Sequence, residues 1–211
     1  MSNRIWEQSI RQFVADAASA KPTPGGGSVA ALVAALGASM TAMVGNLSQG
    51  EKFAAYEPEI TAAIQGMYSL IQESEKLLAK DIACFNAYMN ILQLKCYSAE
   101  EKLARKQALQ EATIQALLVP LHLIEACKDG LQLTSSITAQ ANRNVISDLG
   151  IGAILLEAAA QSALLTVEIN IQALKDNALK DQYALQAFSL MQEISALKHN
   201  VIQAARQRIA N

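Results

Sequence analysis

The stretch VAALVAALGASMTAMV, residues 29–44, decides the fold. It is sixteen residues long, and only Gly37, Ser39 and Thr41 interrupt its apolar residues. Alanine and leucine favour helix, and small side chains let a neighbouring backbone approach closely. The stretch is shorter than the roughly 20 residues that cross a bilayer. We therefore predict a central buried helix over about Val29–Leu47 and expect no membrane contact.

The segment Lys21-Pro-Thr-Pro-Gly-Gly-Gly27 precedes this helix and ends an earlier one. Its prolines remove backbone donors and its glycines permit positive φ, so the segment predicts a shaped loop. Ser28 is the expected N-cap of the helix that follows. Backbone donors at a helix N-terminus suit an anionic group. The loop is therefore either a ligand cradle or a tight interhelical turn, and both interpretations stay open.

Apolar residues at helical spacing predict further helices on both sides of this stretch. We expect them over about 5–18, from Pro58 toward Tyr97, from Ser98 through a kink at Pro120, and over about 131–139, 145–174 and 181–209. Ser98-Ala-Glu-Glu101 fits a capping box. No repeat or linker divides the chain. The prediction is an all-α fold, a single-domain bundle of long helices over residues 1–211 with a Gly-rich loop before the second helix.

Composition restricts the class of partner. Asp and Glu number 19 against 17 Lys and Arg, so no basic field would attract nucleic acid. Cys84, Cys96 and Cys127 form no C-x-x-C pair and fall inside predicted helices, so we interpret them as reduced core thiols. Together with an N-terminus that lacks a secretory pattern, they indicate a cytoplasmic protein. The two histidines lie far apart, and His122-x-x-Glu125 fits an ordinary polar contact, so we expect no metal site.

Polar residues in apolar surroundings are the candidates for chemistry. Asp81 lies in the middle of the predicted third helix beside Ile82, where a buried carboxylate is costly unless it is paired. It is either a salt-bridged or half-exposed residue or a catalytic acid/base. Asn170 lies between two isoleucines, and its amide must find partners. The polar group over 142–148 is either a simple helix start or part of a site.

Several motifs resemble the formiminotetrahydrofolate cyclodeaminase family, which includes stand-alone bacterial methenyltetrahydrofolate cyclohydrolases. Its opening resembles Pro24-Gly-Gly-Gly-Ser-Val-Ala30 and Met43-Val-Gly-Asn-Leu47. The resemblance continues in order through Asp81-x-x-x-Phe85, Val119-Pro-Leu121, Ser147-Asp-Leu149 and Ile169-Asn170. It spans nearly the whole chain. Single motifs are weak, but their ordered series is specific.

The resemblance implies an all-α homodimer that binds a tetrahydrofolate derivative in a cleft between helices, with no cofactor besides that substrate. The implied catalytic residue is Asp81. The implied substrate-binding residues are Gly25, Gly26, Gly27, Ser28, Asn46, Lys52, Asn142, Ser147, Asp148 and Asn170. The implied reaction is cyclisation of 5-formiminotetrahydrofolate to 5,10-methenyltetrahydrofolate with release of ammonia, a step in histidine degradation.

Two positions depart from the family pattern. Members often carry two basic residues after the glycine that matches Gly50, where this chain has Glu51-Lys52; these bases are candidates for holding the folate glutamate tail. Some members carry a carboxylate two residues before Asp81, where this chain has Ala79. Three alternatives remain: a methenyltetrahydrofolate cyclohydrolase, a folate- or partner-binding helical protein without turnover, and a structural helical oligomer.

Overall fold

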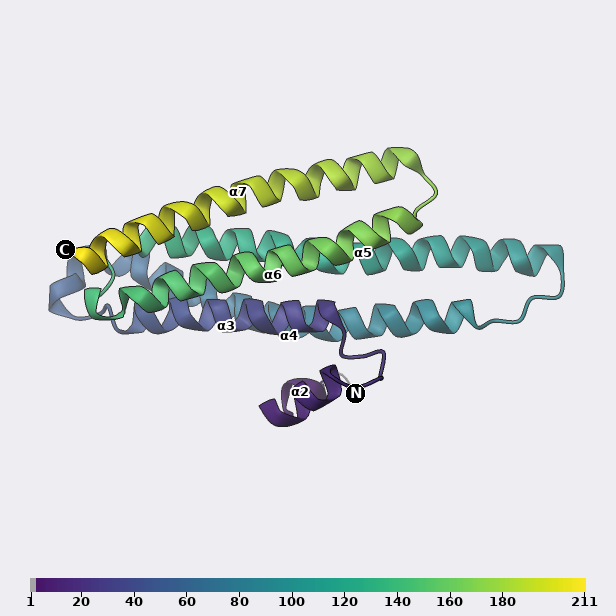
Figure 1. Cartoon of the computed structure of the whole chain (residues 1–211), viewed down its shortest axis with the longest axis horizontal. Coiled ribbons are helices and arrows are strands. Elements are labelled where there is room, and N and C mark those ends of the chain that lie inside the picture. Colours follow the sequence, from purple (N-terminus) through teal and green to yellow (C-terminus); the bar gives the residue numbers. More distant parts are fainter. Residues whose placement is uncertain (1–2) are drawn as a thin grey trace.

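The computed structural model describes residues 3–211, which form helices and connecting loops and no strand. The α-helices are α1 (Asn3–Trp6), α2 (Ile10–Ala17), α3 (Gly26–Asn46), α4 (Glu57–Leu92), α5 (Ala99–Ile137), α6 (Ile146–Ala173) and α7 (Asn177–Ala210), and the 3-10 helices are η1 (Glu51–Tyr56) and η2 (Arg143–Val145). The five long helices α3 to α7 run alternately up and down one bundle (Figure 1). The all-α bundle predicted from the sequence is confirmed.

The helix α3 is central, as its small side chains predict. It packs against α4 on one side and α6 on the other, while α5 packs against α4 and α6, and α7 covers α5 and α6. A Cβ atom on Gly37 would lie 3.0 Å from the carbonyl oxygen of Gly152. The backbones of α3 and α6 therefore approach closely at this crossing, and a side chain at position 37 would require them to move apart.

Two helical segments are apolar and long enough to cross a membrane by length and composition. They are Gly26–Asn46 and Arg143–Ala173. In the most apolar 18-residue stretch of each segment, 56% and 44% of the residues are buried in the bundle. Both segments belong to helices, α3 and α6, that pack against each other and against further helices of the bundle, as core helices do.

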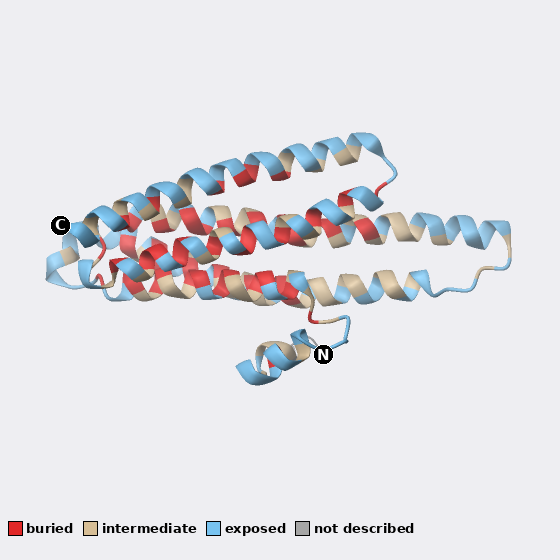
Figure 2. Cartoon of the chain, in the orientation of Figure 1, coloured by how far each residue is buried: buried red, intermediate tan, exposed pale blue. Residues whose placement is uncertain are grey.

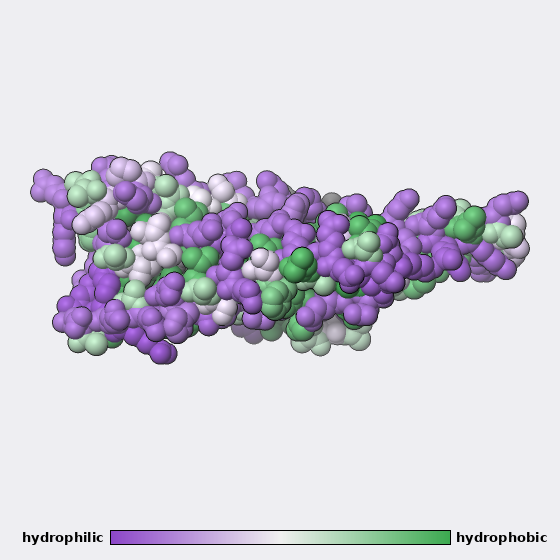
Figure 3. Space-filling model, turned by 90° about the horizontal axis from the view of Figure 1, so that it is seen from above, coloured by the Kyte–Doolittle hydropathy of each residue, from purple (hydrophilic) through white to green (hydrophobic). Residues whose placement is uncertain are grey.

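The helices α4 and α5 are longer than the others and project beyond them as an arm. The last fully buried residue of α4 is Leu78 and the first of α5 is Thr113, so the residues of 79–112 are at most half-buried. Figure 2 shows the buried residues in the body of the bundle, whereas the arm has only intermediate and exposed residues. Figure 3 shows the same arm as a narrow, mainly hydrophilic extension. The root of the arm lies beside the start of α3, and it is there that the polar residues of α4 and α3 meet.

Two predictions about the N-terminal third are wrong. The expected helix over 5–18 is broken into α1 and α2, because Ser9 caps α2 by accepting a hydrogen bond from the Gln12 N–H. The expected N-cap Ser28 lies inside the first turn of α3, and Gly25 is the N-cap. The reason is that the Ser28 side chain is turned toward another helix instead of its own backbone.

The helix limits further along the chain also differ in places. The capping box at Ser98 is confirmed. The separate helix expected over 131–139 does not exist, because α5 continues through Pro120 to Ile137. The helix expected from Pro58 toward Tyr97 is α4, and it ends at Leu92. The loop that follows holds Cys96.

The three cysteines are free thiols, but the prediction that all three are core residues is wrong for two of them. Cys127 is fully buried, and burial raises the pKa of its thiol to about 12. Cys84 and Cys96 are half-buried, and Cys96 lies outside the helices. The difference follows from their positions, because both lie on the arm.

Candidate functional site

A cavity of about 380 Å³ lies at the root of the arm, between α4, α5 and α6. Its lining residues are Asp81, Cys84, Phe85, Tyr88, Thr113, Ala116, Thr166, Ile169, Asn170 and Ala173. A much smaller gap next to it, lined in part by Gly27 and Pro120, also reaches Asp81. The site is therefore wide enough for a flat ring system and has one carboxyl group, that of Asp81, in its lining.

Asp81 is held by the first turn of α3. The buried Ser28 hydroxyl donates to Asp81 Oδ2 at 2.8 Å, and the Ser28 backbone N–H also donates to this carboxylate. Gly25, the N-cap of α3, provides no side-chain cap, so Asp81 of α4 is the anion at this helix N-terminus. The glycine loop therefore binds a carboxylate of the protein itself, which the sequence did not indicate.

Gly27 allows this approach. A Cβ atom at Gly27 would lie 2.3 Å from Asp81 Oδ1 and 2.7 Å from its carboxyl carbon. Contacts that short do not occur, so any side chain here would displace the carboxyl group. Gly26, by contrast, has nothing within 4 Å of such an atom.

Burial raises the pKa of the Asp81 carboxyl group above its ordinary value, and the two hydrogen bonds from Ser28 oppose this rise. The net direction favours the protonated acid more than in water. Burial also raises the pKa of the neighbouring Cys84 thiol, and the Asp81 charge adds to that rise. Cys84 is therefore a thiol rather than a thiolate nucleophile, and Asp81 is the group best suited to transfer protons.

A second polar group of the site is the Asn170 amide, which contacts the backbone of α5 at the turn before Pro120. Proline has no N–H, so within α5 the carbonyl group of Ala116, four residues earlier, loses its usual helical donor. Asn170 Nδ2 donates to this Ala116 oxygen at 3.3 Å and to the Thr166 oxygen at 2.9 Å. Two backbone carbonyl groups thus orient the amide, and Oδ1 of Asn170 stays available as an acceptor at the cavity.

Several lining residues were not found by sequence reasoning. Cys84 and Tyr88 lie three and seven residues after Asp81, so helical spacing alone could have placed them on its face. Thr113 and Thr166 gave no such signal, because they come from α5 and α6 and only packing brings them to Asp81. Phe85 and Tyr88 add aromatic walls that suit a flat heterocycle.

The other expected substrate-binding residues lie at the opposite end of the bundle. Asn46 ends α3 and donates to Tyr68, and Lys52 is exposed in η1. Since α3 is 21 residues long, about 30 Å separates them from the glycine loop. Within one chain, Gly27, Ser28, Asp81 and Asn170 come together, and this second set does not join them.

Asn142 has a clear structural role at that far end. Its backbone N–H donates to Ser48 Oγ at 2.8 Å, and its Nδ2 donates to the Leu47 oxygen at 2.9 Å. It thereby ties the end of α3 to the turn before α6, and it also caps η2. Ser147 is exposed and Asp148 is half-buried in the first turn of α6.

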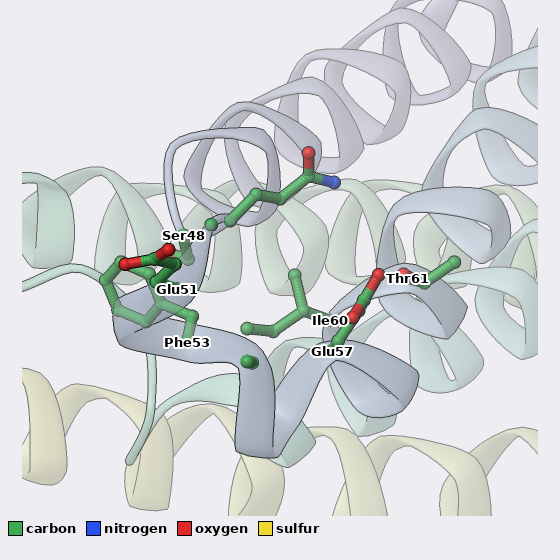
Figure 4. Close-up of a pocket in the computed structure, with 9 residues that line it drawn as sticks. Ser48, Glu51, Phe53, Glu57, Ile60 and Thr61 are labelled. Atoms are coloured by element: carbon green, nitrogen blue, oxygen red, sulfur yellow. The ribbon is translucent and has the colours of Figure 1, made fainter.

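A separate cavity of about 330 Å³ lies at the same far end, between the end of α3, η1 and the start of α4. Figure 4 shows Ile60 between Glu51 and Phe53 on one side and Glu57 and Thr61 on the other. Two carboxylates in its lining disfavour an anionic ligand. The Asp81 cavity has one carboxyl group in its lining and also has aromatic walls, so of these two cavities it is the better candidate for a ligand with a flat ring.

The described part of the chain holds no cluster of metal-ligating side chains. Within residues 3–211 no three His, Cys, Asp or Glu side chains are grouped so that they could hold a metal ion. The pair expected to be an ordinary polar contact, His122 and Glu125, lies 3.9 Å apart on an exposed face of α5.

Comparison with known proteins gives consistent matches. The formiminotransferase-cyclodeaminase family model matches residues 9–188. A methenyltetrahydrofolate cyclohydrolase from Methylorubrum extorquens is 31% identical over 203 residues, which are 96% of this chain and 98% of that protein. A formimidoyltransferase-cyclodeaminase from Rattus norvegicus is 32% identical over 190 residues, 90% of this chain but 35% of that protein. The crystal structure of a formiminotetrahydrofolate cyclodeaminase from Thermotoga maritima has a TM-score of 0.80 and 25% identity, covering 98% of both chains.

Proposed function

The chain belongs to the formiminotransferase-cyclodeaminase family, and on that premise we propose that it cyclises 5-formiminotetrahydrofolate to 5,10-methenyltetrahydrofolate with release of ammonia. The observation that carries the proposal is the Asp81 carboxyl group, which faces a cavity with aromatic walls and has a raised pKa. The folate ring lies in this cavity, and the substrate is the only small molecule that the reaction needs.

The chemistry requires protons to move between two nitrogens. The N10 amine attacks the formimino carbon, forming the C–N10 bond, and the C–N bond to the departing nitrogen breaks. Protonated Asp81 first donates a proton to the departing nitrogen. Its carboxylate then accepts the N10 proton and passes it to the same nitrogen. Ammonia leaves, and the positive charge stays on the methenyl bridge. Solvent then reprotonates Asp81. A carboxyl group with a raised pKa suits both transfers.

The direct test measures ammonia release and methenyl absorbance with 5-formiminotetrahydrofolate, for the wild-type protein and Asp81→Asn. We expect turnover in the wild type and a loss of about 10²–10⁴-fold in the variant. An Asp81→Asn protein that folds and keeps full turnover contradicts the role of Asp81. Binding of folate without any turnover supports a binding protein instead, and absence of both binding and turnover supports a structural oligomer.

A second candidate is methenyltetrahydrofolate cyclohydrolase activity, favoured by the relative that this chain matches over almost its whole length. Here water attacks the bridging carbon, and ionised Asp81 accepts the water proton. The two reactions need Asp81 in opposite starting states. A cyclohydrolase rate that depends on Asp81 rises as pH passes through its raised pKa, whereas the cyclodeaminase rate falls. Following both reactions across pH separates them.

We further propose that the protein acts as a cytoplasmic homodimer in histidine degradation. The helices α3 and α6, which pack together, leave large apolar side chains exposed, among them Leu36, Ile154 and Leu165. A second copy packed there would bury them. It could also bring its Asn46, Lys52, Asn142, Ser147 and Asp148 toward the Asp81 cavity, which one chain cannot do.

Subunit mixing tests this arrangement. We expect an inactive Asp81→Asn protein and an inactive Asn142→Ala protein to regain part of their activity when their subunits are exchanged, because mixed dimers contain one intact pair. A monomer in light scattering, or mixtures without any recovery, contradicts a site shared between copies.

A further inference from the structure

A gap of about 10 Å³ lies beside the Asp81 cavity, and Asp81 is the one residue that both linings contain. The other residues that line the gap come from α3, α4 and α5; they are Gly27, Ala31, Leu77, Val119, Pro120 and Leu123. A single water molecule needs a space of about 10–15 Å³. The gap therefore has room for one atom heavier than hydrogen, directly beside the proposed acid/base.

The lining of the gap is apolar except at Asp81. Among the described residues that form it, no other has a polar side chain, and Pro120 also lacks a backbone N–H. A buried water molecule typically makes about three hydrogen bonds to the protein. One carboxyl group does not offer that many, so the gap suits a small group that is covalently attached to a bound ligand better than it suits a resident water.

The two oxygens of Asp81 have different surroundings. Oδ2 accepts from the Ser28 hydroxyl at 2.8 Å. Oδ1 is the oxygen closest to the position that a Cβ atom on Gly27 would take, and Gly27 itself lines the gap. Ser28 thus holds one oxygen in place, while the missing side chain at Gly27 leaves the other oxygen open to a group in the gap.

The proposed reactions place a group of this size on the bridging carbon. When N10 has attacked the formimino carbon, that carbon is bonded to N5, N10, a hydrogen and an amino group, which leaves as ammonia. When water has attacked the methenyl bridge, a hydroxyl group takes the place of the amino group. N5 and N10 belong to larger parts of the substrate. The amino or hydroxyl group is a single heavy atom, and it is the group that exchanges a proton with Asp81.

We propose that this gap binds the single-atom group on the one-carbon unit, which is the formimino nitrogen that leaves as ammonia or, with the methenyl compound, the oxygen of the attacking water. The inference rests on the proposed function, which places the folate ring in the Asp81 cavity. A group that points from that cavity past the carboxyl group enters the gap and meets Oδ1. The apolar side chains of Leu77, Val119 and Leu123 keep bulk water from this position, so the proton of Asp81 goes to the group on the carbon.

The test measures binding without turnover. 5-Formyltetrahydrofolate carries an oxygen where the formimino compound carries its departing nitrogen, whereas tetrahydrofolate has no one-carbon group to enter the gap. Ala31→Val fills the gap from α3, and Val119→Ile adds one methyl group from α5. We expect each variant to bind 5-formyltetrahydrofolate about tenfold more weakly than the wild type, because the added atoms occupy the space of the formyl oxygen, while the affinity for tetrahydrofolate stays the same.

Two control variants carry the same substitutions outside the gap. Ala35→Val lies one turn further along α3 and is also buried, and Val33→Ile lies on the same helix and is half-buried, as Val119 is. We expect both to bind the two folates as the wild type does. Val119→Ile is the milder of the two gap variants, because it adds one methyl group at a half-buried position, so it provides the test if Ala31→Val does not fold.

Calorimetric titration of both folates into the folded variants separates this inference from the proposed function. A loss of affinity that is confined to 5-formyltetrahydrofolate and to the gap variants supports the gap as the site of the single-atom group. Unchanged binding of 5-formyltetrahydrofolate in the gap variants overturns the inference, as does an equal loss for both folates, and either result leaves the proposed function in place. A wild type that binds neither folate overturns both.

Discussion

At the scale of single residues, the burial of Asp81 affects the stability of the protein and its activity in opposite directions. Because the folded pKa is raised, stability from this group is present at acid pH and is lost as pH rises from the ordinary pKa of Asp toward the folded value. Asp81→Asn removes this loss. We expect the melting temperature of Asp81→Asn to rise relative to that of the wild type as the pH rises to neutral. The turnover of the variant is expected to be lower than that of the wild type. Thermal melts at several pH values measure it, and a variant that loses stability at neutral pH contradicts it.

Gly27 acts through the position of the same carboxyl group. We expect Gly27→Ala to displace Asp81 from Ser28 and to lower kcat about 10²-fold, the effect of a misplacement of roughly 1 Å. The pH dependence of kcat should shift with it, because the Ser28 hydrogen bonds are lost.

Gly26→Ala adds the same methyl group one residue earlier, where nothing lies within 4 Å. It reports how far an extra methyl group in this turn changes the melting temperature. If Gly26→Ala and Gly27→Ala lower kcat equally, the loss comes from a change in the loop and not from the contact between position 27 and Asp81.

At the scale of elements, α5 and α6 depend on each other through one carbonyl group. Pro120 leaves the Ala116 oxygen without a helical donor, and Asn170 supplies one. We expect Asn170→Leu to destabilise the protein by about 1 kcal/mol, because it removes the hydrogen bonds of the amide and leaves the partly buried Ala116 oxygen without its donor. In a Pro120→Ala background the effect should shrink, because the alanine restores a backbone N–H that can donate to the Ala116 oxygen.

Denaturant unfolding of the two single variants and the double variant gives the coupling free energy directly. A coupling near zero would show that Asn170 does not compensate for the proline. The hydrogen bond from Asn170 to the Thr166 oxygen, within α6, would then account for its whole effect on stability.

At the scale of the whole molecule, two cavities at opposite ends compete as the folate site. A folate at 100 times its Kd stabilises by about 2.7 kcal/mol, which for a chain of this size raises the melting temperature by roughly 5–10 °C. We expect Phe85→Ala, in the Asp81 cavity, to reduce this shift. Phe53→Ala, in the far cavity, truncates the same side chain type and should keep it. The reverse result would move the ligand to the far end.

The sequence alone determined the class of fold and most of its helices. Some of their limits follow from local features such as the capping box at Ser98, which acts over a few residues of one chain segment. The small side chains of residues 29–44 also sufficed to predict a central helix, because burial of α3 needs only that its neighbours can approach. Asp81 could be named as a candidate from its apolar surroundings and from the family resemblance.

Only the tertiary structure decided which candidates share a site. It brings Gly27, Ser28 and Asn170 to Asp81 and leaves Asn142 at the other end, where Asn142 ties two turns together. It also turned Ser28 from an expected cap into a donor to Asp81, and it placed the gap lined by Gly27 and Val119 beside the same carboxyl group. The physical reason is that helical spacing defines the faces of one helix, whereas contacts between helices depend on how far each helix extends and where the small residues let two backbones meet.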